Sequence, residues 1–91
     1  MNIPSVKSIP NALKIYYAHS EIGNKQIKDL FGSPSSATVA KLKRAVKNEM
    51  AKREIMSYGH NKVNTCVAYE VWGIDVIDLE RRMKKLKNLD L

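Results

Sequence analysis

The fold is decided by residues 21–56, EIGNKQIKDLFGSPSSATVAKLKRAVKNEMAKREIM, which predict two helices joined by a tight turn. We expect the first helix at about residues 24–31, with Asn24 as its cap, because a side-chain oxygen there can accept from the free N–H groups of the opening turn. Gly32 should end this helix, since glycine adopts left-handed backbone angles at no steric cost. Three apolar residues at helical spacing form its predicted buried face: Ile27, Leu30 and Phe31.

The second helix is expected at about residues 35–57, and it is long and basic. Ser33 and Pro34 make the turn before it, because proline lacks an N–H and disfavours helical angles at the preceding residue. Either Ser35 or Ser36 can cap this helix. Apolar residues spaced by three and four predict its buried stripe, which consists of Val39, Leu42, Val46 and Met50.

A short helix, a glycine-containing turn and a longer basic helix resemble the helix-turn-helix superfamily of DNA-binding proteins. The shared features are the buried Ile27 and Phe31, the turn residue Gly32, the cap at Ser35 or Ser36, and the buried Val39. Two features depart from the repressor-type motif: the segment between Gly32 and Val39 is about one residue longer, and Lys28 stands where a small residue is usual. The resemblance covers about a third of the chain. It implies a regulator of the size and basicity found in bacteria and their phages, with its second helix in the major groove of double-stranded DNA.

The outer face of the second helix has the residue types that read DNA bases. Lysine and arginine reach guanine acceptors, asparagine pairs with adenine, and small residues let a helix approach the groove floor. We therefore expect base contacts from Ser36, Ala37, Lys41, Arg44 and Asn48. Hydroxyls at the helix start and lysines nearer its edges suit backbone phosphates. The expected phosphate contacts are Lys25, Lys28, Ser33, Ser35, Thr38, Lys43 and Lys47.

The charge of the chain favours a polyanionic partner. Sixteen Lys and Arg residues against nine Asp and Glu residues give a net charge of +7, which suits nucleic acid or an anionic membrane surface. Residues 35–57 hold six basic and two acidic residues, a net of +4, so more than half of the excess lies on the second helix. No stretch approaches the roughly 20 apolar residues of a membrane span. Without a signal-peptide pattern, and with Cys66 as the single cysteine, we expect a cytoplasmic protein.

The flanking segments complete an expected all-α fold of about five helices. Residues 1–9 are expected to be a flexible arm, and residues 10–57 a helix-turn-helix core that includes a first helix at about 10–20. Pro10 suits the first turn of that helix, or Asn11 could be its cap. Its inward face is expected to be Ala12, Ile15 and Tyr16, and could include His19.

Residues 58–91 are expected to form a C-terminal helical pair for packing or dimerisation. The loop around residues 57–64 contains turn residues and is too short for a full two-stranded wing. The next helix, TCVAYEVW, has Asn64 or Thr65 as its cap and Gly73 as its stop. Its last residue, Trp72, is expected to anchor the core. Cys66 is expected to be a small buried residue.

The last helix, residues 76–89, has Asp75 as its expected cap and an apolar series at 3-4-3 spacing: Val76, Leu79, Met83 and Leu86. This stripe could pack on the three-helix core or form a short dimer seam, although two heptads are too few for a stable isolated coiled coil. We favour a combination, in which the last two helices form a second layer and expose an apolar edge to a second copy. Such a dimer would place two recognition helices one DNA turn apart.

Neither catalytic nor metal-binding motifs appear. His19, His60 and Cys66 fit no common zinc spacing and lack a fourth ligand, and no phosphate-binding glycine loop or nucleophile motif is found. We expect no enzyme activity, no metal and no cofactor. The alternative function is a protein-interaction module that uses the apolar face of the C-terminal helices. DNA binding requires an open face at Lys41, Arg44 and Asn48, whereas the alternative predicts that this face is covered or that Glu49 and Glu54 break its potential.

Overall fold

The computed structural model describes residues 3–89, which form five helices and one two-stranded sheet. The elements are α1 (Ile9–Ala18), β1 (Glu21–Ile22), α2 (Asn24–Phe31), α3 (Ser36–Lys52), β2 (Val63–Asn64), α4 (Thr65–Val71) and α5 (Val76–Leu89). The chain is therefore mostly helical, as expected. The sheet was not expected, because a two-residue strand is too short to show an alternating pattern in the sequence.

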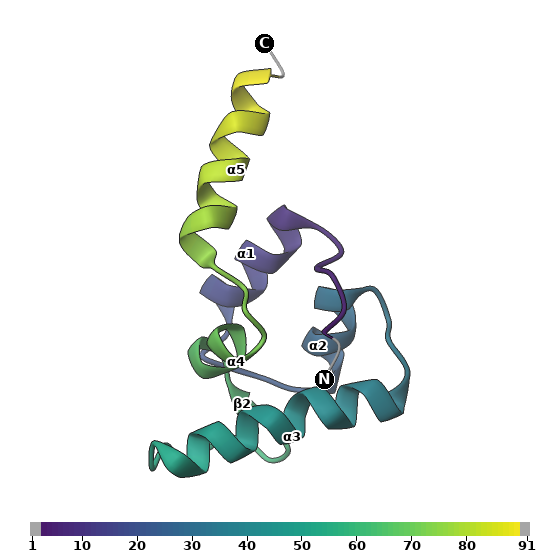
Figure 1. Ribbon diagram of the computed structural model, residues 1–91, viewed down its shortest axis with the longest axis vertical. Helices are drawn as coiled ribbons and strands as arrows, with labels where there is room; N and C mark the ends of the chain where they lie inside the picture. The colour runs from purple at the N-terminus through teal and green to yellow at the C-terminus, as the bar shows by residue number, and fades with distance from the viewer. Residues whose placement is uncertain (1–2, 90–91) are drawn as a thin grey trace.

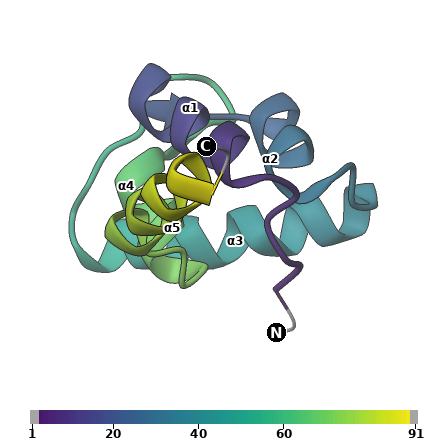
Figure 2. The same cartoon turned by 90° about the horizontal axis from the view of Figure 1, so that it is seen from above.

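The molecule is elongated, with α3 at one end and the C-terminal part of α5 at the other (Figure 1). Its principal dimensions are 45 × 26 × 21 Å. α2 lies over the N-terminal half of α3 and α4 lies over the C-terminal half, with α1 beyond both (Figure 1). Figure 2 shows α5 almost end-on, so this helix runs along the long axis and away from α3.

The hydrophobic core contains the stripes that the sequence predicts for α2 and α3. Ile27, Leu30 and Phe31 are buried, as are Val39, Leu42, Val46 and Met50. The indole N–H of Trp72 donates to the Leu42 carbonyl oxygen over 3.2 Å, and its ring lies 5.3 Å from that of Phe31. Trp72 is therefore the core anchor that was predicted, because its ring is buried and its one polar atom has a partner.

The sheet joins two connections that are far apart in the sequence. β1 and β2 pair antiparallel, with Glu21 opposite Asn64 and Ile22 opposite Val63. Both apolar side chains are fully buried, so the pairing is held by the core on one face. As a result, the segment between α1 and α2 lies beside the segment between α3 and α4.

Two helices begin with caps other than the expected ones. At α2 the cap position is Gly23, whose N–H donates to Gln26 Oε1 over 2.9 Å, so Asn24 is not the cap. At α1 the cap is Ser8, whose Oγ accepts from the Asn11 N–H, and Pro10 lies in the first turn. Because the backbone of Ser8 is extended, its hydroxyl faces the free N–H groups of the first turn. The side chain of a residue inside the helix cannot reach these groups.

The ends of α1 and α3 differ from the prediction. α1 stops at Ala18, and His19 is exposed rather than inward. α3 stops at Lys52 rather than near residue 57, because Glu54 takes a left-handed φ of 57° and the Ile55 N–H donates to the Met50 carbonyl oxygen over 2.9 Å. This Schellman closure turns Ile55 toward the core, where it packs half-buried; a continuing helix would have left it on the outer face.

The remaining helix boundaries match the prediction more closely. Ser35 caps α3, Asn64 caps α4, and Gly32 and Gly73 stop α2 and α4 with φ of 75° and 71°. Asp75 caps α5, its Oδ1 accepting from the N–H groups of Ile77 and Asp78. Cys66 is exposed, so its expected burial is wrong. Val67, Ala68 and Tyr69 occupy the inner side of this short helix and leave Cys66 outside.

The N-terminal segment lies against the helices along part of its length. Val6 packs on the core, and the Lys7 N–H donates to the Leu30 carbonyl oxygen over 2.9 Å. Residues 1 and 2 of the expected arm lie outside the described residues. The flexibility of the arm stays a prediction.

Candidate nucleic-acid interface

Four of the five expected base-contacting residues lie on the outer side of α3, and the fifth, Ser36, lies at the start of the helix and lines a groove toward α2. Ser36, Ala37, Lys41, Arg44 and Asn48 are all exposed. They are brought together because the buried stripe of α3 faces α2, α4 and β2, which leaves the opposite side of the helix at one end of the molecule (Figure 1). The Lys41, Arg44 and Asn48 face is therefore uncovered by the residues that the structure describes.

The seven expected phosphate-contacting residues do not form one group. Lys28, Lys43 and Lys47 line a common groove, whereas Lys25 lies toward α1 beside Lys14. A second set lies at the start of α3. Ser35 Oγ accepts from the Thr38 N–H over 3.2 Å and hydrogen-bonds to Thr38 Oγ1 over 2.9 Å, so both hydroxyls take part in the helix cap. Ser33 is exposed in the turn with a φ of 59°.

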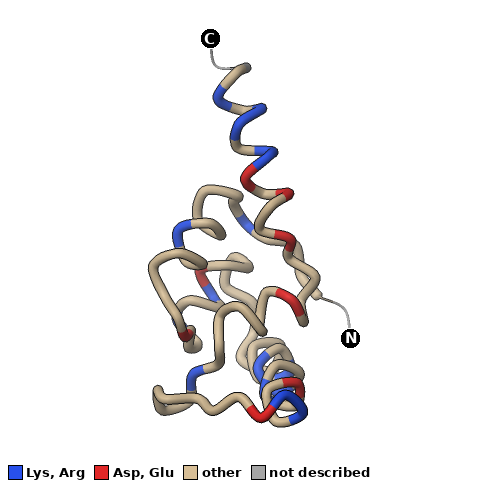
Figure 3. The backbone as a smooth tube through the Cα atoms, turned by 90° about the vertical axis from the view of Figure 1, so that its left-hand side faces the viewer, with Lys and Arg blue, Asp and Glu red and all other residues tan. Residues whose placement is uncertain are grey.

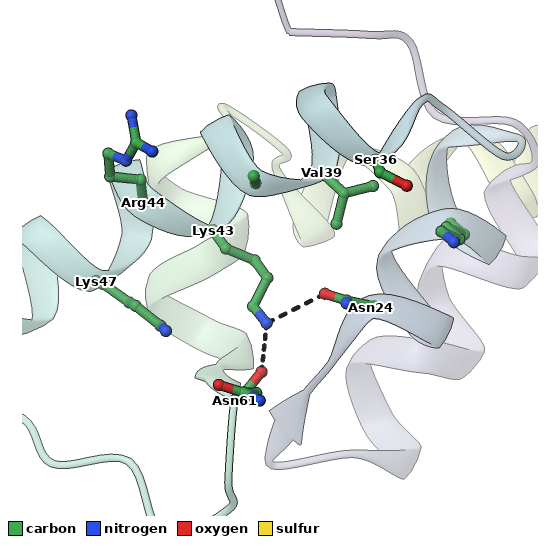
Figure 4. A pocket seen from close by; sticks show the side chains of 9 residues that line it. Asn24, Ser36, Val39, Lys43, Arg44, Lys47 and Asn61 are labelled. Carbon is green, nitrogen blue, oxygen red and sulfur yellow. Dashed lines mark hydrogen bonds between the residues drawn. The ribbon is translucent and has the colours of Figure 1, made fainter.

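The groove has a volume of about 440 Å³ and is bounded by α2, α3 and the residues before β2 (Figure 4). Its lining consists of Asn24, Lys28, Ser36, Val39, Ala40, Lys43, Arg44, Lys47 and Asn61. Asn24 and Asn61 were not expected here: the sequence indicated only a helix cap and a turn residue. No local pattern could have found them, because the tertiary fold brings these distant positions together.

Lys43 lies at the centre of this groove. Its Nζ donates to Asn24 Oδ1 over 3.1 Å and also to the Asn61 backbone carbonyl oxygen (Figure 4). Partial burial lowers the pKa of Lys43, and the positive charge of Lys47 lowers it further. Lys43 therefore links α2 to the loop before β2 through two neutral oxygens.

Two acidic residues near α3 are engaged away from the groove, whereas Glu54, just after the helix, forms no ion pair with the described residues. Arg53 pairs with Glu49 over 2.8 Å and with Glu70 over 2.7 Å. Among the described residues, the other ion pair is Arg82–Asp78 on α5, and the lysines of the groove take part in none. Figure 3 shows basic residues both on α3 and along the projecting part of α5.

The loop at residues 53–62 is held beside the groove by Glu21. The carboxylate of Glu21 accepts from the N–H groups of Tyr58 and Gly59 over 2.8 and 2.7 Å. Burial alone would raise the pKa of Glu21, but these hydrogen bonds, one from Ser57 and the charge of Lys62 outweigh it and lower the pKa. Tyr58 lies in this loop, and its side chain is 92% exposed.

The expected dimer face on α5 is divided by the fold. Leu79 is buried, Val76 and Met83 are half-buried, and Leu86 is 48% exposed. The first half of the stripe is covered because α5 lies beside α1 there, where the Tyr17 hydroxyl also donates to Glu80. The second half extends beyond the rest of the molecule (Figure 1).

Residues 3–89 contain no group of three or more His, Cys, Asp or Glu side chains that could hold a metal ion. Within the same residues, none of the helices combines the length and the apolar character needed to cross a membrane. The chain matches no protein-family model, no curated protein and no solved structure.

Proposed function

We propose that this protein binds double-stranded DNA by setting α3 in the major groove, with α2 and α3 acting as a helix-turn-helix unit. The observation that carries the proposal is the uncovered outer side of α3, where Lys41, Arg44 and Asn48 lie together. α3 spans 17 residues, or about 25 Å at 1.5 Å per residue, and a helix of this diameter fits the major groove.

The charge around α3 supports this function. Arg53 pairs with both Glu49 and Glu70, so its positive charge offsets part of their negative charge, whereas Glu54 forms no ion pair with the described residues. Lys41, Arg44, Lys47 and Lys52 form no ion pair with the described residues. Affinity would come mainly from contacts between these cations and phosphates, with release of counterions, and specificity from Arg44, Lys41 and Asn48. The biological role would be transcriptional control or a phage-type DNA transaction.

The test is binding to a fluorescent random-sequence duplex at several salt concentrations. The wild-type protein should bind with micromolar affinity at low salt and lose affinity steeply as salt rises. Lys41→Glu/Arg44→Glu should abolish binding. Lys84→Glu/Lys85→Glu is the matched control, because it changes the charge equally on α5 and should retain most of the binding. Absence of wild-type binding at low salt, or equal loss in both double variants, would overturn the proposal.

A second candidate function is a protein-interaction module on α5, and it could coexist with the first as a homodimer seam. It is favoured by the exposure of Leu86 (48%) and of Ile77 (67%) on this helix. Two α5 helices paired in parallel would keep both copies of α3 at the same end of the assembly, as half-sites one DNA turn apart require. Sedimentation of the wild type and of Leu86→Glu tests for this dimer. A seam through α5 predicts that the wild type is a dimer and that the variant is a monomer.

A further inference from the structure

We propose that the groove between α2, α3 and Asn61 is a built binding site for one phosphate group, in which Lys43 is a fixed donor and Lys28 and Lys47 are the flanking cations. The inference rests on the proposed function, where the ligand is a phosphodiester of the DNA strand beside α3. The chemistry that the groove recognises is a phosphate oxyanion, which a free phosphate also presents.

The lining of the groove is positively charged. Lys28, Lys43, Arg44 and Lys47 come from two helices, and the remaining described lining residues are neutral. Positive charges around one groove repel one another, and a partly buried ammonium also loses hydration. Burial lowers the pKa of Lys43, and the positive charge of Lys47 lowers it further. An anion in the groove would relieve both, whereas the described part of the chain supplies no carboxylate to do so.

The Lys43 ammonium is held in position by two hydrogen bonds. An ammonium has three N–H donors, and those of Lys43 serve two neutral acceptors, Asn24 Oδ1 and the Asn61 carbonyl oxygen. The third donor remains for a ligand oxygen. Because α2 holds one acceptor and the loop before β2 holds the other, the long side chain is already ordered before a ligand binds. Binding would therefore cost less side-chain entropy than it does at a free surface lysine.

The basic side chains near Lys43 extend in different directions (Figure 4). Lys43 and Lys47 extend toward Asn61, whereas Arg44 extends away from them (Figure 4). Arg44 thus lies at the rim that the groove shares with the outer face of α3. A strand with one phosphate in the groove would pass this rim, which would leave Arg44 free to reach a base edge. Lys43 would thus bind a phosphate, while the adjacent Arg44 would read a base.

The site is tested first without DNA, by following backbone amide NMR signals while inorganic phosphate is added, with chloride at matched ionic strength as the reference. The signals of Asn24 and Asn61 should shift and saturate with phosphate in the wild type, and should not do so with chloride. Lys43→Met should abolish the saturable shift, and Lys14→Met, on α1, should retain it. Lys47→Gln keeps both hydrogen bonds of Lys43 and should weaken phosphate binding severalfold, which tests the site even if Lys43→Met disturbs the loop. Equal shifts with chloride, or unchanged binding in both groove variants, would overturn the site.

The second arm uses the duplex and separates this inference from the proposed function. If a DNA phosphate occupies the groove, Lys43→Met should make the slope of log K against log salt less negative by about 0.9, the change expected for the loss of one phosphate contact. Lys14→Met should leave the slope unchanged. Equal slopes for the two variants would overturn occupancy by DNA while duplex binding itself stands. Phosphate shifts in the groove without any duplex binding would uphold the site for a free phosphate and refute the proposed function.

Discussion

The helices α3 and α5 have the same type of sequence but different surroundings. Each is amphipathic and carries lysines and arginines on its polar side. In α3 all four residues of the apolar stripe are at most 4% exposed, whereas in α5 the exposure rises from 9% at Leu79 to 48% at Leu86. α3 lies across α2, α4 and β2, while α5 meets α1 only along its first half (Figure 1). The spacing of apolar residues thus shows which side of a helix is apolar, and the neighbouring elements decide how much of that side is buried.

The same comparison applies to charge. On α3, Lys43, Arg44 and Lys47 line a groove that α2 and Asn61 also border, so their charges would act together on an anion bound there. On the projecting part of α5, Lys84, Lys85 and Lys87 are exposed to solvent, where they are screened separately. The lysines of the two helices therefore favour different uses.

The largest expected difference between the two helices is in stability. Leu42→Ala should lower the free energy of unfolding by ~2–5 kcal/mol, because it removes a fully buried side chain from the centre of the core. Leu86→Ala should cost less than about 0.5 kcal/mol, because that side chain is half exposed. Urea unfolding of both variants measures the difference. A loss at Leu86 comparable to that at Leu42 would mean that a partner covers the end of α5 in solution.

The next difference is in DNA recognition. Arg44→Ala should weaken binding to a duplex selected from the random pool by ~1–3 kcal/mol if Arg44 reads a base edge. Arg81→Ala removes the same side chain from the first half of α5 and should leave the affinity nearly unchanged. Fluorescence anisotropy on the selected duplex compares the two variants. Equal effects would show that the arginines act only through overall charge, and the assignment of the outer face of α3 would then be wrong.

The smallest difference concerns how the chain continues after each helix. After α3, the loop is tied back by the Glu21 carboxylate through two backbone N–H groups, so Glu21→Gln should lower the free energy of unfolding at pH 7 by about 1 kcal/mol. The lowered pKa of Glu21 means that its contribution is present above the ordinary carboxyl pKa and is lost as the pH falls through the folded value.

Wild type and Glu21→Gln should therefore converge in stability as the pH is lowered, which urea unfolding at pH 7 and in acid would show. Asp29→Asn is the control, because the Asp29 side chain makes no hydrogen bond or ion pair with the described residues. A difference between wild type and Glu21→Gln that persists in acid would mean that the glutamine disturbs packing rather than the charge-assisted hydrogen bonds.

By itself, the sequence determined the helices, the inward faces of α2 and α3, and the ends of α2 and α4. Periodicity identified the stripes of α2 and α3, and Gly32, Gly73 and Asp75 act at helix ends as expected, because these signals depend on residues within a few positions of one another. The exposure of Lys41, Arg44 and Asn48 followed from the same period, since residues opposite a buried stripe face outward.

Only the tertiary structure decided where distant segments meet. The pairing of Ile22 with Val63, the turn of Ile55 back to the core and the exposure of Cys66 depend on which surfaces are already occupied by other elements. The groove has the same origin, because Asn24 and Asn61 become partners of Lys43 only when the sheet draws their segments together. Local sequence patterns do not predict these contacts, because the free energy that favours them comes from burying surfaces that belong to separate parts of the chain.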